Sequence, residues 1–382
     1  MRYRYAVLAA GTLGQASYTA ITLGLAVLAP TLRAHFGLTL TQVGVVLAAP
    51  NLGSIATLYP WGIATDRLGE RLTIGIGLTA AAACVAVAAF AGSFAALTGA
   101  LVLAGAAGAS VNSASGRAVL HWFEAQERGV ALGIRQTAVP IGGAWTAFVL
   151  PALVTHDDPQ PALLTLAAGL LLSAVVGAVV IREGPRAIEP EPARSESPLR
   201  DRSMWLLSLG SGLIIAAQVC IVGFLVLFLH GHRGLTSAAA GFVLGAVNIL
   251  GIGTRIGAGR WSDVIGSRIV PLRLIALACA ILVGCAAVLL SAPLLVLVPL
   301  LVVTGCVAIS WNGLSFTAAA EAAGHARSGT ALGLQQTVLA VAGAVYPIAF
   351  AAFVAGTSWR AAFALVALFP LAGRRLLASV PG

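Results

Sequence analysis

Twelve apolar stretches, each about 20 residues long, run along the chain with short polar segments between them. A helix of that length crosses a hydrocarbon core about 30 Å thick. The stretches do not alternate polar and apolar residues, which excludes the strands of a membrane β-barrel. We therefore predict an all-α integral membrane protein with twelve transmembrane helices, over residues 6–28, 41–63, 72–90, 94–119, 129–150, 161–181, 204–229, 237–260, 269–290, 293–316, 328–354 and 359–377.

The composition agrees with this prediction, since 59% of the 382 residues are apolar and only 9% are charged. A soluble protein of this size could not bury so much apolar surface. The net charge of +9 comes from arginine, because the chain has no lysine. The arginines are dispersed between the apolar stretches rather than gathered in one patch, which argues against nucleic-acid binding.

Arginine is concentrated in alternate loops, and the positive-inside rule therefore predicts that both termini are cytoplasmic. The lack of lysine, together with abundant Ala, Gly and Arg, is typical of a high-GC bacterial genome, so we expect a multi-pass protein of the bacterial inner membrane. The predicted cytoplasmic segments carry Arg2, Arg4, Arg67, Arg71, Arg128, Arg182, Arg186, Arg194, Arg200, Arg202, Arg260, Arg268, Arg273, Arg327, Arg374 and Arg375, whereas the opposite loops carry Arg33, Arg233 and Arg360.

Several sequence features occur twice, about 200 residues apart. Residues 131–137 read Ala-Leu-Gly-Ile-Arg-Gln-Thr, and residues 331–337 read Ala-Leu-Gly-Leu-Gln-Gln-Thr. Asn112 and Asn312 follow the same spacing. The repeat predicts two pseudo-symmetric six-helix bundles, and a polar, proline-rich segment between them predicts a linker. The expected domains are 1–181, the cytoplasmic linker 182–203, and 204–382.

The remaining loops are short and leave no room for a soluble catalytic domain, so we predict that the chain is not an enzyme. A lysine-containing phosphate-binding loop is impossible here, which argues against ATP-driven transport by this chain alone. All five cysteines lie within apolar stretches without metal-ligand spacing, so we expect neither a metal site nor a cofactor. A membrane sensor that binds a ligand without moving it is an alternative, but the short loops supply no output domain.

The segment from Gly62 to Arg71 reads Gly-Ile-Ala-Thr-Asp-Arg-Leu-Gly-Glu-Arg. It resembles the signature loop between helices two and three of the major facilitator superfamily. Residues 259–268 resemble the weaker copy of that loop between helices eight and nine. The resemblance covers the whole chain, and it implies the superfamily's fold of two six-helix bundles and its alternating-access transport.

The same resemblance implies a conformational latch at the cytoplasmic side. Asp66 would accept hydrogen bonds at the start of the eleventh helix, near Gly329, and Asp263 at the start of the fifth, near Gly129. Free N–H groups at a helix N-terminus favour an anion, and these contacts would close that side in the outward-facing state. The alternative is a solvated turn held by surface ion pairs. The latch residues are Gly62, Asp66, Arg67, Gly69, Arg71, Gly259, Asp263, Gly266 and Arg268.

The stretch 129–150 contains Pro140, Gly142 and Gly143, and it resembles the superfamily's antiporter motif, in which a Gly-Pro pair is followed closely by a Gly-Gly pair. Val139 replaces the first glycine, which weakens the indication of antiport. The proline and the glycines are expected to kink the helix and allow close packing. Proton-coupled members often carry an arginine midway along helix four, where this chain has Leu101.

Arg135 and Arg255 lie inside apolar stretches, where a buried charge costs at least about 3 kcal/mol. No Asp or Glu lies deep in any stretch, so the charge favours an anionic substrate. Because the superfamily fold packs helix five beside helix eight, the resemblance implies an anion between the two arginines. Arg255 also resembles the helix-eight arginine of monocarboxylate and oxalate/formate carriers, which binds the substrate carboxylate. The alternative is that each arginine bonds to backbone carbonyls or extends to the membrane interface, as we expect of Arg117.

Further polar side chains could complete a site for a small carboxylate. Gln15 and Tyr18 share one face of the first helix, and Asn248 shares a face of the eighth helix with Arg255. Gln336 and Tyr346 add polar groups from the eleventh helix. Each of these side chains could equally serve as a contact between helices.

These observations lead us to expect a secondary active transporter that moves a small organic anion by alternating access. We expect it to act as a monomer in the lipid bilayer, by symport or antiport, with a coupling proton or a counter-substrate. The alternative is a multidrug or metabolite efflux antiporter for neutral hydrophobic compounds, which the helix-five motif favours and the two arginines disfavour.

Overall fold

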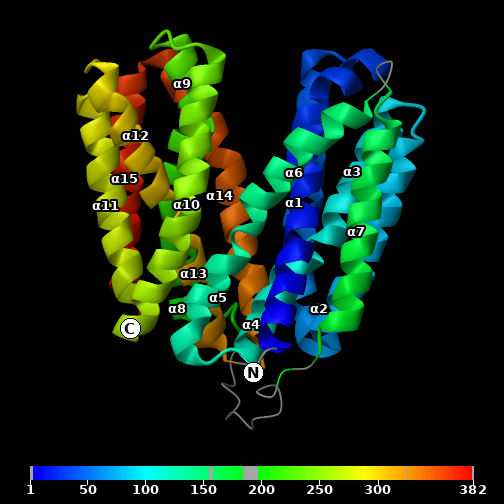
Figure 1. Ribbon diagram of the computed structural model, residues 1–382. Helices are drawn as coiled ribbons and strands as arrows, with labels where there is room; N and C mark the ends of the chain where they lie inside the picture. Colours follow the sequence, from blue (N-terminus) through cyan, green and yellow to red (C-terminus); the bar gives the residue numbers. More distant parts are fainter. Residues whose placement is uncertain (1–2, 155–157, 183, 185–196, 325, 381–382) are drawn as a thin grey trace. The chain divides into compact units, whose positions relative to one another are not determined.

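The computed structural model describes residues 3–154, 158–182, 184, 197–324 and 326–380. Figure 1 traces them as a succession of helices, and this part of the chain contains no β-strand. The all-helical prediction is therefore confirmed. Within the predicted linker, residues 183 and 185–196 lie outside the described residues. Arg2, near the start of the sequence, also lies outside them.

Each of the twelve predicted stretches is helical, although four of them are interrupted. The first half of the sequence forms α1 (Tyr3–Phe36), α2 (Leu40–Ala89), α3 (Phe94–Gly108), α4 (Ser110–Trp122), α5 (Ala125–Arg135), α6 (Ala138–Leu153) and α7 (Gln160–Val180). The second half forms α8 (Arg202–Ala217), a π-helical turn (Gln218–Val222), α9 (Gly223–Gly231), α10 (Ser237–Ile265), α11 (Ile269–Val288), α12 (Leu294–Ala308), α13 (Asn312–Ala323), α14 (Ser328–Gly356) and α15 (Trp359–Leu377).

Nine helical stretches of the described chain are, by length and composition alone, able to cross a membrane. The number falls below twelve for local reasons. α2 holds two predicted stretches, separated at Gly69 by a backbone φ of 79°. α5 and α6 are short because one stretch is interrupted between them, and α15 carries three arginines, Arg360, Arg374 and Arg375.

Hydroxyl side chains begin several of the helices by accepting a hydrogen bond from a backbone N–H group of the first turn. Thr39 caps α2 and Thr236 caps α10, and these two threonines are equivalent in the repeat. Ser93 caps α3 and Ser358 caps α15 in the same way. The first N–H groups of a helix have no partner within it, so these caps stabilise the helix ends.

Contacts divide the chain into two compact units. Unit 1 comprises Met1–Glu124, Arg135–Pro198 and Ala320–Thr337, and unit 2 comprises Ala125–Ile134, Leu199–Ala319 and Val338–Gly382. Each unit thus includes a short segment from the other half of the sequence, and the predicted domains 1–181 and 204–382 stay a prediction.

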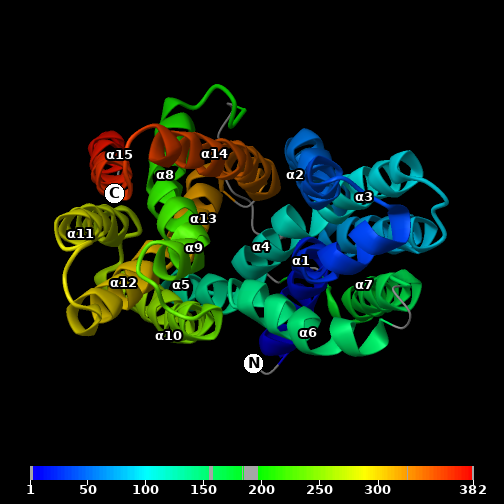
Figure 2. The same ribbon diagram turned by 90° about the horizontal axis from the view of Figure 1, so that it is seen from above.

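The helices of each unit pack side by side (Figure 2). In unit 1, α1 packs against α4, α6 and α7, and α2 packs against α3 and α7. Its core includes Ile21, Leu25, Leu78, Leu97 and Leu170. In unit 2, α11 packs against α12 and α15, and α15 packs against α8.

Equivalent contacts recur in the two units. In unit 1 the Thr57 hydroxyl donates to the carbonyl oxygen of Ala106 at 2.7 Å, and in unit 2 the Thr254 hydroxyl donates to that of Cys306 at 3.0 Å. One residue before each acceptor stands a glycine, Gly105 or Gly305, against which the neighbouring helix packs closely. The sequence repeat is therefore a repeat of interhelical contacts.

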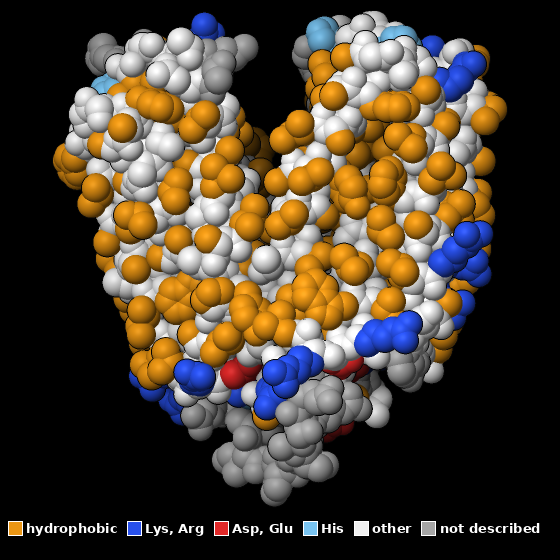
Figure 3. Space-filling model, turned by 180° about the vertical axis from the view of Figure 1, so that it is seen from behind, with side chains coloured by type: hydrophobic (Ala, Val, Ile, Leu, Met, Phe, Trp, Pro, Cys, Tyr) orange, Lys and Arg blue, Asp and Glu red, His pale blue; other side chains and the backbone are white. Residues whose placement is uncertain are grey.

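Large apolar side chains cover the outside of the helices (Figure 3). Phe148 is 83% exposed, Phe242 is 80% exposed and Leu295 is 88% exposed. Such side chains are unfavourable in water and are expected where lipid chains surround a helix. The surface agrees with a multi-pass membrane protein.

The close approach of α2 to α3 generates a first prediction. A Cβ atom on Gly105 would lie 2.0 Å from the carbonyl oxygen of Pro50. We expect Gly105→Ala to destabilise the purified protein by about 1–3 kcal/mol or more, because the backbone of α2 would have to move. The measurement is thermal unfolding in detergent.

Gly99→Ala is the matched control, because it lies on the same helix α3 and nothing lies within 4 Å of the added Cβ. Alanine has the higher helix propensity, so this variant should be as stable as the parent or slightly more stable. Equal midpoints for the two variants would contradict the packing argument.

Candidate substrate site and helix latch

Arg135, the last residue of α5, is buried in unit 1 with 1% of its surface exposed. Its Nη1 donates to the hydroxyl oxygen of Ser115 on α4 at 2.9 Å and to Oε1 of Gln15 on α1 at 3.3 Å. The Gln15 amide nitrogen then donates to Oδ1 of Asn112 at 3.1 Å. These four side chains form one hydrogen-bonded group from three helices, which we call the Arg135 cluster.

The local sequence places Arg135 at a helix end. The helix stops after Arg135 and begins again at Ala138, because Pro140 has no N–H group to donate to the carbonyl oxygen of Gln136. A cation at a helix C-terminus interacts favourably with the helix dipole. Beyond the break, a Cβ on Gly142 would lie 2.6 Å from the carbonyl oxygen of Ala16, so the helix-five motif also allows α6 to pack on α1. A Cβ on Gly143 would lie 2.9 Å from the side chain of Leu23.

Unit 2 contains a counterpart of the amide pair. Asn312 donates from Nδ2 to Oε1 of Gln218 at 3.3 Å, which repeats the Gln15–Asn112 contact between equivalent helices. Gln218 is the first residue of the π-helical turn, a feature often found at functional sites. The residue equivalent to Arg135 is Gln335, so the amide pair is repeated and the arginine is not.

Arg255 on α10 is buried in unit 2 with 5% of its surface exposed. Its Nε donates to the carbonyl oxygen of Ile309 at 3.0 Å. Ile309 is the C-cap residue that follows α12, and carbonyl groups at a helix C-terminus have no partner within the helix. This is the bond expected of a structural role. Arg135 lies in unit 1 and Arg255 in unit 2, and an anion shared between them stays a prediction.

The other predicted site residues differ in burial and in their contacts. Tyr18 is buried in unit 1, and its hydroxyl donates to the carbonyl oxygen of Gly105 at 3.4 Å, which makes it a contact between helices. Asn248 is half-buried and donates to the carbonyl oxygen of Leu244 in its own helix at 3.1 Å. Gln336 is half-buried in unit 1. Tyr346, half-buried in unit 2, lies with its ring centroid 5.3 Å from that of Phe369.

The first predicted latch contact is formed within unit 1. Asp66 Oδ1 accepts from the backbone N–H of Gly329 at 2.9 Å, and Oδ2 accepts from that of Thr330 at 2.7 Å. The Thr330 hydroxyl also donates to Oδ2 at 2.5 Å. These N–H groups belong to the first turn of α14, where an anion is favoured.

The second contact is formed within unit 2 at the equivalent residues. Asp263 accepts from the N–H of Gly129 at 3.0 Å and from that of Val130 at 2.9 Å. α5 begins at Ala125, four residues before the predicted stretch, so Asp263 binds the second turn rather than the first. Arg268 pairs with Asp263 at 2.5 Å and also donates to the carbonyl oxygen of Ala125.

Glycines permit both contacts. Gly69 and Gly266 have φ of 79° and 71°, in the left-handed region that other residues rarely adopt. A Cβ on Gly62 would lie 2.5 Å from the carbonyl oxygen of Gly329, and one on Gly259 would lie 2.3 Å from that of Gly129. In each copy, one glycine turns the chain and the other allows close helix packing.

Unit 1 also contains a network of charged side chains that was not predicted from the sequence. Arg117 on α4 pairs through Nε with Asp66 at 3.2 Å and through Nη1 with Glu70 at 3.1 Å, and His121 Nδ1 lies 2.7 Å from Glu70. Two carboxylates of this loop hold the Arg117 guanidinium, with 12% of the side chain exposed, and the expectation that Arg117 extends to the membrane interface stays a prediction. The spacing of Arg117 and His121, four residues apart on one helix, was the available signal.

The network sets the ionisation of its two acids, which lie in the loop between predicted membrane stretches. Burial raises the pKa of the Asp66 carboxyl, and the hydrogen bonds from Thr330 and the charge of Arg117 oppose that rise. Burial also acts to raise the pKa of Glu70, but the hydrogen bond and charge of His121 and the charge of Arg117 outweigh it and hold that pKa below its ordinary value. Arg67 and Arg71, also expected in the latch, are exposed.

Comparison with known proteins agrees with this architecture. A solved structure of a proton:xylose symporter superposes with a TM-score of 0.79 over 99% of this chain and 96% of its own, at 16% sequence identity. A hexuronate transporter of Bacillus subtilis is 23% identical over 170 residues, which is 44% of this chain and 40% of that protein.

A more extensive match is an uncharacterized MFS-type transporter of Mycobacterium tuberculosis. It is 34% identical over 352 residues, which cover 91% of this chain and 79% of that protein. The family model described as Major Facilitator Superfamily matches residues 11–347. Members of this family are membrane transporters and not enzymes. The chain, with its twelve apolar stretches and its duplicated aspartate contacts, therefore belongs to the Major Facilitator Superfamily.

Proposed function

We propose that this transporter carries a small organic anion by alternating access, and that Arg135 binds the carboxylate of the substrate. The observation that carries the proposal is the Arg135 cluster, in which a buried guanidinium donates to the neutral side chains of Gln15 and Ser115. These hydrogen bonds hold the guanidinium in one orientation within the cluster. A carboxylate can accept paired hydrogen bonds from a guanidinium, which gives both affinity and orientation.

The charge distribution of the sequence supports the same proposal. The thirteen acidic residues all lie outside the predicted membrane stretches. A transporter of cations would need a buried carboxylate to bind its substrate. A buried arginine is expensive in a membrane, about 3 kcal/mol or more, and an anionic substrate would account for that cost.

The asymmetry of the repeat also supports it. The amide pair Gln15–Asn112 has its counterpart in Gln218–Asn312, as expected of a scaffold. Arg135 has Gln335 as its counterpart and so departs from the scaffold. The hexuronate named for the Bacillus subtilis relative is a sugar acid, which makes a hexuronate the first substrate to test.

Alternating access would require the two sequence halves to separate at their cytoplasmic ends in each cycle. Asp66 and Asp263 each bind a helix from the other half, and we assign them the role of latches that form and break. In this proposal the protein acts as a monomer in the bacterial inner membrane with both termini in the cytoplasm. A proton could be the coupling ion, and a counter-substrate is the other possibility that transport assays address.

The binding role of Arg135 is tested with the variant Arg135→Gln, which introduces the residue found at the equivalent position of the repeat. Glucuronate should raise the unfolding temperature of the purified parent protein, because a ligand that binds only the folded state stabilises it. In the variant we expect an affinity about 10- to 100-fold weaker, since hydrogen bonds to a charged group contribute about 1.5–3 kcal/mol.

Two comparisons control this experiment. Glucose, which has a hydroxymethyl group in place of the carboxylate, should produce no shift. Arg360→Gln, at an exposed arginine bonded to Ser291, should leave the glucuronate shift unchanged. Arg255→Gln should lower the unfolding temperature without ligand, because Ile309 loses its donor. Stabilisation by neutral hydrophobic compounds that Arg135→Gln does not alter would overturn the anion proposal and favour the exporter.

The latch is tested with Asp66→Asn, which weakens the interaction with the N-terminus of α14 by about 1–2 kcal/mol. We expect glucuronate exchange in proteoliposomes to slow by about tenfold, while the glucuronate-induced thermal shift persists. Asp201→Asn is the control, because Asp201 caps α8 through the N–H of Ser203 within a single local segment. Loss of ligand binding in Asp66→Asn would refute a purely conformational role.

A further inference from the structure

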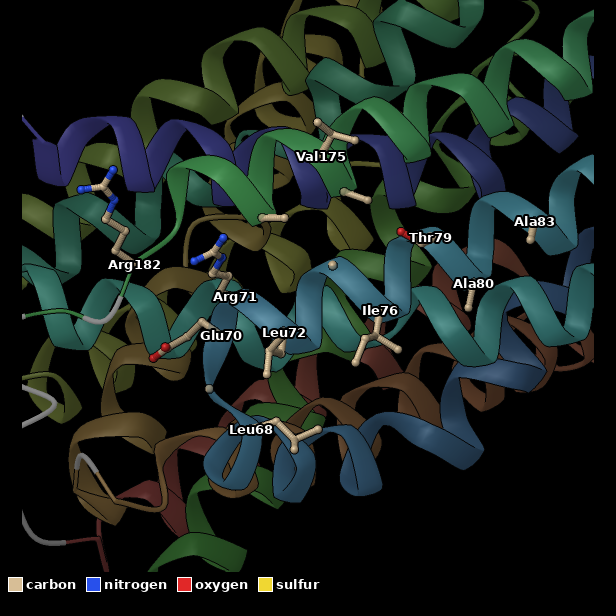
Figure 4. Close-up of a pocket in the computed structure, with 14 residues that line it drawn as sticks. Leu68, Glu70, Arg71, Leu72, Ile76, Thr79, Ala80, Ala83, Val175 and Arg182 are labelled. Atoms are coloured by element: carbon tan, nitrogen blue, oxygen red, sulfur yellow. The ribbon is translucent and has the colours of Figure 1, made fainter.

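A groove in unit 1 is separate from the Arg135 cluster and lies between the second part of α2 and α7. Its volume is about 1020 Å³. Small residues create the space, since α2 contributes Gly75, Ala80 and Ala83 to its walls and α7 contributes Ala174 and Ala178. Figure 4 shows the two helices bordering it along their length.

Most of the remaining lining residues are apolar, with Thr79 and the buried Glu70 as polar exceptions, and several of the apolar side chains are exposed. Leu72 is 54% exposed, Ile76 is 52% exposed and Val175 is 54% exposed. In a protein of this superfamily such a surface faces lipid, because the helices are surrounded by hydrocarbon. The groove therefore suits an acyl chain.

Two arginines stand at one end of the groove, Arg71 at the start of the second part of α2 and Arg182 just after α7 (Figure 4). Among the described residues, no carboxylate forms an ion pair with either guanidinium. The neighbouring acid, Glu70, is buried and already held by Arg117 and His121. Both arginines thus line the groove without an acidic partner from the described chain.

Arg182 is held in place by contacts that leave its charge intact. Its carbonyl oxygen accepts from the indole N–H of Trp122 at 3.0 Å, and its guanidinium lies over the ring of Tyr3 at 5.2 Å. A guanidinium stacked on an aromatic face keeps its N–H donors in the plane of the group, available to a phosphate.

The dimensions of the groove agree with one lipid leaflet. From Leu72 to Ala83 the helix rises about 16 Å, which is half of a hydrocarbon core about 30 Å thick. Figure 4 places Thr79, Ala80 and Ala83 away from the arginine end. A phosphate at the arginines would therefore lie at the interface with its acyl chain in the groove.

We infer that this groove is a binding site for an anionic phospholipid, whose phosphate is held by Arg71 and Arg182 and one of whose acyl chains fills the space between α2 and α7. An anionic headgroup is favoured over a zwitterionic one, because the two arginines would repel an ammonium group. The site is independent of the proposed substrate.

The test is native mass spectrometry of the delipidated full chain, titrated with phosphatidylglycerol, phosphatidylethanolamine or glycerol phosphate. We expect one phosphatidylglycerol to bind at least about tenfold more tightly than phosphatidylethanolamine. The double variant Arg71→Gln/Arg182→Gln should lose that preference. Arg375→Gln, at an exposed arginine of the last turn of α15 outside the groove, should retain it.

A second variant keeps the test independent of the arginines. Ala83→Phe places a ring in an exposed part of the groove, so it should weaken phosphatidylglycerol binding at least about tenfold without removing a charge. The inference is overturned if either groove variant binds phosphatidylglycerol as the parent does. It is also overturned if glycerol phosphate binds as tightly as the intact lipid, which would indicate a site for free phosphate.

Discussion

Hydrocarbon offers no hydrogen-bond partner to a polypeptide backbone, and this constraint organises the whole molecule. Each apolar stretch becomes helical because a helix satisfies its own N–H and C=O groups. Where a helix is interrupted, a polar group from a neighbouring helix takes over, as Arg255 does at the carbonyl of Ile309 and Thr57 at that of Ala106. Glycines such as Gly105 then bring helix backbones close enough for these bonds to form.

The two aspartate contacts are the same solution used twice with different charge partners. Asp66 and Asp263 each bind two consecutive backbone N–H groups of a helix from the other half of the sequence. In unit 1 the cation is Arg117, supplied by α4, whereas in unit 2 it is Arg268, supplied by the loop itself. The backbone geometry is repeated and the electrostatic support is not, so the two latches need not break with equal ease.

The proposed site also combines contacts that are repeated in both units with one contact that is not. The paired amides, Gln15 with Asn112 and Gln218 with Asn312, satisfy polar groups at equivalent points of the two units. Only the first of these pairs is joined to an arginine in the described contacts, through Gln15 and Arg135. Because the amide pair is duplicated and the arginine bonded to it is not, the proposed site can distinguish the two ends of a substrate. The lipid groove, in contrast, uses arginines on the outside of a unit, where the membrane supplies the ligand.

The sequence by itself determined the helical membrane fold and the repeat, because segment length, hydropathy and residue spacing act locally along the chain. The aspartate contacts were expected from the resemblance of residues 62–71 and 259–268 to the superfamily's loop. The sequence identified Arg135 as buried, but not its partner Ser115, nor the pairing of Arg117 with Glu70. Those pairings, the interruptions at Ala109 and Gln136, and the groove between α2 and α7 were decided by the tertiary structure. The physical reason is that hydrogen-bond partners and grooves depend on which faces of distant helices pack together. The residues next to a side chain in the sequence do not specify that packing.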